Sequence, residues 1–197
     1  MESDMDDARL GDPLHQFWAM AQAHVGIGTL RGVMPTPWND AILPPAFSFG
    51  DSPELADELL ALVLDGKKTA TTGLEQEYLD EGEPIPKVGD LSIVTDGNGT
   101  PRALIRDEEV CVLAFGDVTA KQAALEGEDD RTLESWRRVH RAIWHRRGVE
   151  ITDDTRVVWE RFSVKFQVQK LRLWDEQMDR VAQISAADVE AELLADG

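Results

Sequence analysis

Three short apolar runs separated by turn residues constrain the fold of this 197-residue chain more than any other feature. The runs are 91–94, 102–105 and 110–115, and Asp96-Gly97-Asn98-Gly99 lies between the first two. Runs of this length bounded by Gly, Asn and Asp are typical of short strands joined by tight turns. A later segment, Val158 to Val168, alternates between apolar and polar residues. The sequence therefore predicts an antiparallel meander with a late strand that closes the sheet.

Helices are expected around these strands, because capping residues precede several amphipathic stretches. The expected helices begin at Asp12-Pro13, Ser52-Pro53, Thr119, and Asp130 or Thr132, and Gly66 and Gly127 end two of them. Gly and Pro interrupt residues 26–45, which predicts an irregular segment. Helix signals return after residue 169.

The charge of the chain is strongly acidic and uneven. The chain has 38 Asp and Glu against 20 Lys and Arg, for a formal net charge of −18, yet residues 131–170 hold 10 bases and 5 acids. Such a basic run is first interpreted as a solvated helix face beside acidic neighbours, and second as a binding patch. Because phosphate contacts dominate nucleic-acid affinity, the acidic total argues against a duplex DNA partner.

Composition also limits location and chemistry. No apolar stretch approaches the roughly 18 residues of a membrane span, and the first residues are acidic, so a cytoplasmic protein without membrane contact is expected. The only cysteine, Cys111, excludes a disulfide framework. The four histidines form no i, i+4 pair, and no phosphate-binding, dinucleotide or serine-hydrolase motif occurs, so no metal and no cofactor are expected. His140 shares an apolar helix face with Trp136, which favours a core or supporting role.

One segment carries residues suited to catalysis. Lys68 and Thr71 follow the helix-ending Gly66. A partly desolvated lysine can act as a base, and a nearby hydroxyl can act as a nucleophile. In a regular strand, however, residues three apart point to opposite faces, so both reach one site only if the backbone turns. The alternative is a helix terminus carrying lysines that favour its dipole.

The order of several motifs resembles the ASCH family, named for activating signal cointegrator homology. The motifs are Phe49-Gly50-Asp51-Ser52, Gly66 to Thr71, Pro86 to Asp90, Phe115 to Val118, Glu126-Gly127-Glu128, Leu133 with Trp136 and His140, and Trp159-Glu160-Arg161-Phe162. The resemblance implies a domain over 47–168, with a helical and irregular extension at 1–46 and a helical one at 169–197. It implies an α+β, PUA-like fold, a small antiparallel β-barrel flanked by helices, whose cleft takes RNA or a nucleobase.

The resemblance also implies site residues. The family pattern G-x-K-x-x-T places a lysine at Lys68 and a threonine at Thr71, and a T-x-K-x-A-x-x-E pattern places a glutamate at Glu126, with Glu128 as the alternate. A small bacterial member uses a lysine, a threonine and a glutamate to deacylate N4-acetylcytidine. Thr71 would attack or position water, Lys68 would accept the proton or stabilise the oxyanion, and Glu126 would orient the lysine or act as acid.

Substrate contacts are assigned to aromatic and basic residues. Trp136, Tyr78 and Trp38 offer stacking faces, although Trp136 at helical spacing also suits the core. Arg137 and Arg141, together with Arg138, would hold phosphates of a strand. Two functions follow: an amidohydrolase acting on N4-acylated cytidine-type nucleosides, and a module binding short single-stranded RNA, with ribonuclease activity as one form of it. A regulatory protein with an inactive cleft ranks third, and a homodimer is left open.

Overall fold

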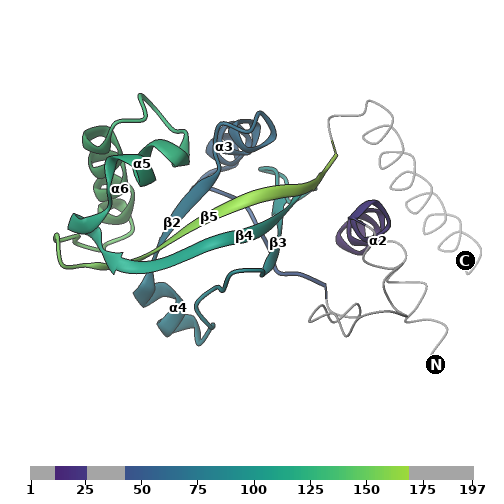
Figure 1. Cartoon of the computed structure of the whole chain (residues 1–197), viewed down its shortest axis with the longest axis horizontal. Coiled ribbons are helices and arrows are strands. Elements are labelled where there is room, and N and C mark those ends of the chain that lie inside the picture. The colour runs from purple at the N-terminus through teal and green to yellow at the C-terminus, as the bar shows by residue number, and fades with distance from the viewer. Residues whose placement is uncertain (1–11, 26–42, 169–197) are drawn as a thin grey trace, which may run out of the picture. The chain divides into compact units, whose positions relative to one another are not determined.

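The computed structural model describes residues 12–25 and 43–168, in which five strands form one sheet with helices around it (Figure 1). In chain order the elements are α2 (Pro13–Val25), β1 (Ala46–Phe47), α3 (Pro53–Leu64), β2 (Ala70–Leu74), α4 (Glu75–Glu81), β3 (Leu91–Thr95), β4 (Pro101–Ala114), the short 3₁₀ helix η2 (Phe115–Asp117), α5 (Ala120–Glu126), α6 (Leu133–Arg146) and β5 (Arg156–Gln167). Three expectations lie outside the described residues. They are the stacking role of Trp38, most of the irregular segment 26–45, and the helices after residue 169.

The sheet has the strand order β1-β3-β4-β5-β2. The short β1 pairs in parallel with β3, and all other neighbours are antiparallel. This confirms the α+β, PUA-like architecture, but the barrel is only partial, since the sheet is not closed between β1 and β2. The late strand was expected to close the sheet; instead β5 is an interior strand between β4 and β2.

Strand β4 joins two segments that the sequence predicts as separate strands. The acidic run 107–109 resembles a turn, but it forms an irregularity within a continuous β4–β5 ladder. Two of its three charges are paired across the strands: Glu108 accepts hydrogen bonds from Ser163 Oγ at 2.6 Å and Lys165 Nζ at 2.9 Å, and Glu109 pairs with Arg161 at 3.2 Å. Opposite-charge pairs between strands stabilise a sheet, so tertiary pairing outweighs the local turn tendency.

The predicted helix starts are confirmed by side-chain caps. Asp12 Oδ1 accepts a hydrogen bond from the Leu14 amide, and Ser52 Oγ accepts one from the Leu55 amide. Thr119 forms a capping box with Gln122. Thr132, rather than Asp130, caps α6. Each cap satisfies amides that have no partner within the helix. Helix α4 was not predicted, because Leu74 precedes it without a side-chain cap and none of its residues is buried.

Two apolar clusters hold the helices on the sheet. The first packs α3 against the strands through Leu59, Leu60 and Val63. The second joins α5 and α6 through Ala123, Trp136 and Trp144. Strand β2 lies at the sheet edge, where it contacts α5 and leads directly into α4. The chemistry-bearing residues of β2 therefore lie between these two helices.

Candidate active site

Lys68 is buried where the end of α5 meets the chain before β2. Its side chain is 1% exposed. The Thr69 amide donates to the carbonyl of Leu125 at 2.9 Å, and Gly127 sits so close that a Cβ there would lie 2.3 Å from the Lys67 carbonyl oxygen. Gly127 also has φ 73°, which favours glycine. This close approach brings the glutamates on either side of Gly127 to the lysine.

The Lys68 ammonium lies between two carboxylates. Its Nζ is 2.5 Å from Glu128 Oε1 and 3.8 Å from Glu126 Oε2. It also lies 5.1 Å from the centre of the Phe49 ring, within cation–π range. A buried ammonium needs such compensation, because removing a charge from water is costly.

Glu126 is the centre of a hydrogen-bonded network. Its Oε1 accepts from Thr72 Oγ1 at 2.6 Å and from Trp136 Nε1 at 2.6 Å, and its Oε2 lies 3.5 Å from His140 Nε2. Burial raises the pKa of this carboxyl, but the hydrogen bond and charge of His140, the charge of Lys68 and the Thr72 hydroxyl outweigh burial and lower the pKa to about 2. Glu126 is therefore ionised, with its lone pairs largely used by neighbours.

His140 supports this network from α6. Its ring stacks on Trp136 with centres 4.3 Å apart and meets Trp144 edge-on at 5.2 Å. Its Nδ1 lies 2.9 Å from the Trp136 carbonyl oxygen, which only accepts, so Nδ1 carries hydrogen. Its Nε2 faces the Glu126 carboxylate, 3.5 Å from Oε2.

Thr71 lies on the other face of β2 from this network. Thr72 is paired with Trp159, whereas Thr71 is directly opposite Glu160. Successive strand residues point to opposite faces, so the Thr72 hydroxyl reaches Glu126 while the Thr71 side chain points to the other face. A cavity on that other face is lined by Thr71, and Thr72 and Gly73 also border it. The backbone does not turn to bring Thr71 and Lys68 into one site. The two side chains lie on opposite faces, as the spacing of three residues predicts for an extended segment.

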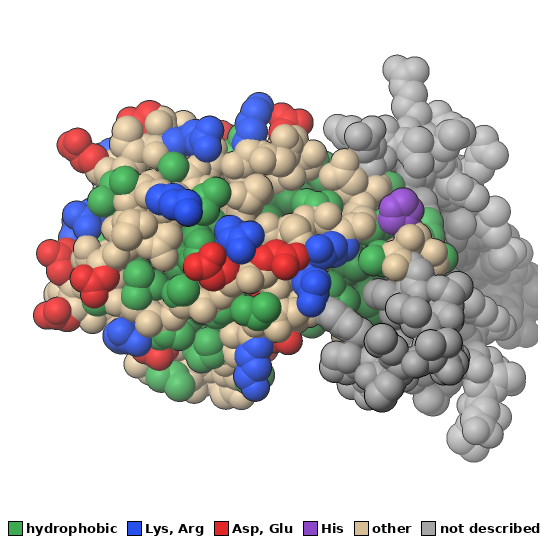
Figure 2. Space-filling view, in the orientation of Figure 1, with side chains coloured by type: hydrophobic (Ala, Val, Ile, Leu, Met, Phe, Trp, Pro, Cys, Tyr) green, Lys and Arg blue, Asp and Glu red, His purple; other side chains and the backbone are tan. Residues whose placement is uncertain are grey.

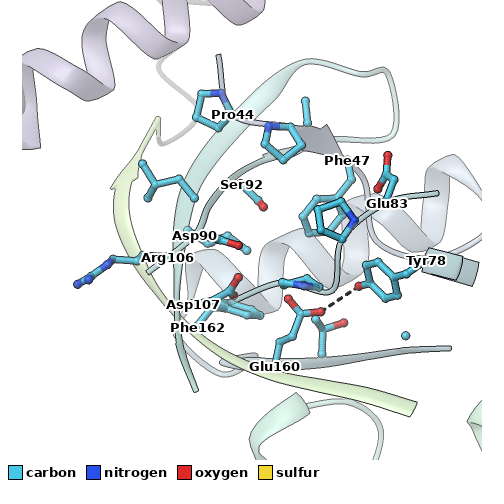
Figure 3. A pocket seen from close by; sticks show the side chains of 18 of the residues that line it. Pro44, Phe47, Tyr78, Glu83, Asp90, Ser92, Arg106, Asp107, Glu160 and Phe162 are labelled. Atoms are coloured by element: carbon cyan, nitrogen blue, oxygen red, sulfur yellow. Dashed lines mark hydrogen bonds between the residues drawn. The ribbon is translucent and has the colours of Figure 1, made fainter. Parts of the chain in front are cut away.

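The cavity beside Thr71 has a volume of about 1110 Å³ and lies between β2, α4, the 82–90 segment and the central strands. Figure 3 shows Tyr78, Phe47 and Phe162 around it, with Asp107 and Glu160 pointing into it and Arg106 extending away. Among the described residues its charged lining is mostly acidic, with one cation, Arg106, against five carboxyls: Glu81, Glu83, Asp90, Asp107 and Glu160.

Two of these carboxyls are buried. Asp107 is 5% exposed and Glu160 is 8% exposed, and Tyr78 Oη donates to Glu160 Oε1 at 3.1 Å. Burial, then the charge of Asp107, raises the pKa of Glu160 to about 7. Burial, then the charges of Asp90 and Glu108, raises the pKa of Asp107 to about 6. Such shifted groups suit proton transfer near neutral pH.

Of the residues assigned to substrate contact that lie within 12–25 and 43–168, only Tyr78 lines this cavity. Trp136 is buried against Phe115, with ring centres 5.0 Å apart. Arg137 donates to the Gly116 carbonyl at 2.7 Å, and Arg141 binds Asp153 at 2.6 Å.

The other arginines of the basic run are also engaged. Arg138 pairs with Asp129, Arg146 with Asp51 and Arg147 with Glu77. Figure 2 shows Lys and Arg side chains scattered among Asp and Glu on the face it draws. This arrangement agrees with the first interpretation of the run, a solvated helix face beside acidic neighbours.

Sequence reasoning did not single out Asp107, Glu160 and Thr72. Asp107 lies in the run that resembles a turn, and Glu160 interrupts an apolar strand between Trp159 and Arg161. A lone carboxylate at an inward strand position was the available signal for Glu160.

A sequence model of the ASCH domain matches residues 45–165. The chain belongs to the ASCH family. This ASCH protein is similar to the solved structure of an ASCH domain from Lactobacillus crispatus, with 28% identity, a TM-score of 0.60, and coverage of 75% of this chain and 94% of that one. It is also similar to protein EF3133 from Enterococcus faecalis, with 27% identity, a TM-score of 0.58, and coverage of 74% and 88%. No curated protein matches it. Within the described residues, no helix combines the length and hydrophobicity needed to cross a membrane.

Proposed function

We propose that this ASCH protein is a metal-independent amidohydrolase that removes the acyl group from N4-acylated cytidine-type nucleosides bound in the cavity. The observation that carries the proposal is the position of Thr71, whose hydroxyl lies on the cavity face directly opposite the buried Glu160. Hydrolysis of an amide needs an oxygen nucleophile and a group that moves protons beside it. These two side chains supply both on one face of the sheet.

The cavity suits a neutral nucleoside better than a phosphate chain. Its volume of about 1110 Å³ is slightly above the usual range of small-molecule sites, so it has room for a nucleoside. The rings of Phe47, Tyr78 and Phe162 provide apolar and stacking surface for a base. Carboxylates repel phosphates, so the acidic lining counts against a bound strand.

Thr71, Lys68 and Glu126 take different roles in this proposal. Thr71 contacts the substrate and attacks it or orients the attacking water. Lys68 and Glu126 are positioning residues, because both are 1% exposed and neither lines the cavity. Through Thr72, Glu126 fixes the adjacent residue of β2, and this holds Thr71 toward the cavity. In this proposal Lys68 and Glu126 hold Thr71 in place, whereas the family resemblance implies that they transfer protons directly.

The test is release of cytidine from N4-acetylcytidine by the purified full chain. We expect turnover without added metal, and a loss of at least about 100-fold in kcat/KM for Thr71→Val. Thr152→Val, in an exposed loop outside the cavity, is the matched control and should leave kcat/KM within about two-fold. Absence of cytidine release by the wild type would refute the hydrolase.

Single-stranded RNA binding is the second outcome of the same experiment. A wild type that releases no cytidine but binds short RNA, with binding weakened by Thr71→Val, would replace the hydrolase by a binding module. The acidic cavity and the paired arginines count against this outcome.

A further inference from the structure

Asp107 is a buried carboxyl that has no side-chain partner within residues 12–25 and 43–168. It is 5% exposed and points into the cavity beside Thr71 (Figure 3). Only its backbone is bonded: its amide donates to the Asp90 carbonyl at 3.0 Å, and its carbonyl accepts from the Gly89 amide at 2.8 Å. Buried polar groups are normally hydrogen-bonded, so an unpartnered carboxyl aimed into a cavity indicates a group kept for a ligand.

Asp107 and Glu160 face the cavity as near neighbours on adjacent strands. Asp107 is directly opposite Phe162 in the β4–β5 ladder, and Glu160 lies two residues from Phe162 on β5. Residues two apart in a strand share a face, so Glu160 lies on the same face as Phe162 and Asp107, with the irregularity of β4 between the two carboxyls. Both side chains line the same cavity. Tyr78 from α4 donates to the Glu160 carboxyl from its other side.

Two buried carboxyls this near each other resist holding two negative charges. A like charge favours the neutral form of its neighbour, and desolvation acts in the same direction. The groups around the pair are mostly acidic as well: Asp90 lies before β3, Glu108 is on β4, Glu81 ends α4 and Glu83 follows it. Arg106 on β4 is the one cation lining the cavity in the described part of the chain. Near neutral pH the pair therefore carries about one proton and one negative charge.

We infer that Asp107 and Glu160 are the acid–base pair of the cavity, with ionised Asp107 as the base and protonated Glu160 as the acid. This inference rests on the proposed hydrolysis; it adds Asp107 as a catalytic residue and makes Glu160 the acid. Asp107 takes a proton from the attacking water as the water oxygen bonds to the acyl carbon. Glu160 gives its proton to N4 as the bond between N4 and the acyl carbon breaks. The products are the free amine of cytidine and a carboxylic acid, and a proton shift from Asp107 to Glu160 restores the pair.

The geometry favours this pair over Lys68 and Glu126 for proton transfer. Glu126 already accepts from Thr72 and Trp136, and the Lys68 ammonium is bound to Glu128. Asp107 has all its lone pairs free within the described residues, and Glu160 binds only Tyr78 there. A group that moves protons to and from a substrate must have this freedom.

The first test is the pH dependence of kcat/KM for N4-acetylcytidine. The wild type should show a bell-shaped profile, because activity needs Asp107 ionised and Glu160 protonated. Asp107→Asn should remove the acidic limb, Glu160→Gln should remove the basic limb, and each should lower the maximum by at least about 100-fold. Glu109→Gln, an exposed residue of β4 paired with Arg161 outside the cavity, is the matched control and should keep the wild-type profile. Either cavity variant with a wild-type profile would overturn the inference.

A second measurement separates failure of this inference from failure of the proposed function. Carboxyl carbons of ¹³C-labelled Asp and Glu are titrated by NMR with and without cytidine. The titration runs from about pH 4, near the ordinary pKa of Asp and Glu, to about pH 9. If the wild type releases no cytidine, the proposed hydrolase is refuted. The NMR titration then tests Asp107 and Glu160 independently of hydrolysis. Two signals that titrate near neutral pH, disappear in the two variants and shift on addition of cytidine would support a proton-exchanging ligand site. Signals that titrate only in the ordinary acidic range, or that ignore cytidine, would refute it.

Discussion

Glu128, and not Glu126, forms the short ion pair with Lys68, at 2.5 Å against 3.8 Å. The two glutamates flank Gly127, and their exposure differs, since the Glu126 side chain is 1% exposed and that of Glu128 is 22% exposed. Glu128 therefore neutralises the lysine from the solvent side. Glu126 instead ties β2, α5 and α6 together through Thr72, Trp136 and His140.

Glu126→Gln should destabilise the protein more than Glu128→Gln. Removing one partner of a fully buried charge network costs roughly 3–5 kcal/mol, and a partly exposed pair costs less. Because the pKa of Glu126 is lowered to about 2 from 4.5, its contribution is present above pH 4.5 and is lost as pH falls toward 2. Urea unfolding at several pH values should show a smaller acid loss for Glu126→Gln than for wild type. Equal stabilities of the two variants at pH 7 would contradict this assignment.

Replacing Thr71 and Thr72 by valine should separate activity from stability. Thr72→Val removes a donor to the buried Glu126 carboxylate and should cost about 2 kcal/mol. Thr71→Val removes a hydroxyl that has no side-chain partner among the described residues, so its unfolding free energy should stay within about 0.5 kcal/mol of wild type. Thermal unfolding measures the stability of both variants. Cytidine release measures the activity that Thr71→Val should lose. Loss of stability in Thr71→Val would place its hydroxyl in the structural network instead.

Glu160→Gln should stabilise the protein at alkaline pH. The folded-state pKa of Glu160 is raised to about 7 from 4.5, so wild type loses stability as pH rises from about 4.5 through 7. The variant lacks this loss and should gain roughly 1–3 kcal/mol over wild type between pH 5 and pH 8. Asp107→Asn should behave similarly over a lower range, since its pKa is raised to about 6 from 3.8. Unfolding curves in urea at both pH values check this, and a pH-independent difference would refute the raised pKa.

RNA binding should be weak and restricted to single strands. Arg138, Arg141 and Arg146 already pair with carboxylates, so binding phosphate first requires breaking those pairs. Fluorescence titration with a short single strand and a duplex, at low and physiological salt, should show affinity that falls steeply with salt. Nanomolar duplex binding at physiological salt, unchanged when Arg137, Arg138 and Arg141 are replaced, would contradict the charge argument.

Local chemistry made several elements predictable from the sequence. The capping residues Ser52, Thr119 and Thr132 begin helices because their side-chain oxygens satisfy free amides within a turn. Gly127 ends α5 because its positive φ is accessible to glycine. The order of motifs from Phe49 to Phe162 was sufficient to indicate the ASCH family and its α+β fold.

Tertiary pairing decided what the local pattern left open. Residues 107–109 resemble a turn, and only their partners on β5 make them part of one long strand. The spacing of Lys68 and Thr71 allowed one shared site or two faces, and the pairing of β2 with β5 selected two faces. Asp107 and Glu160 are 53 positions apart in the sequence, and strand register alone brings them to one cavity. Register depends on contacts summed over the whole sheet, so no short segment of the sequence encodes it.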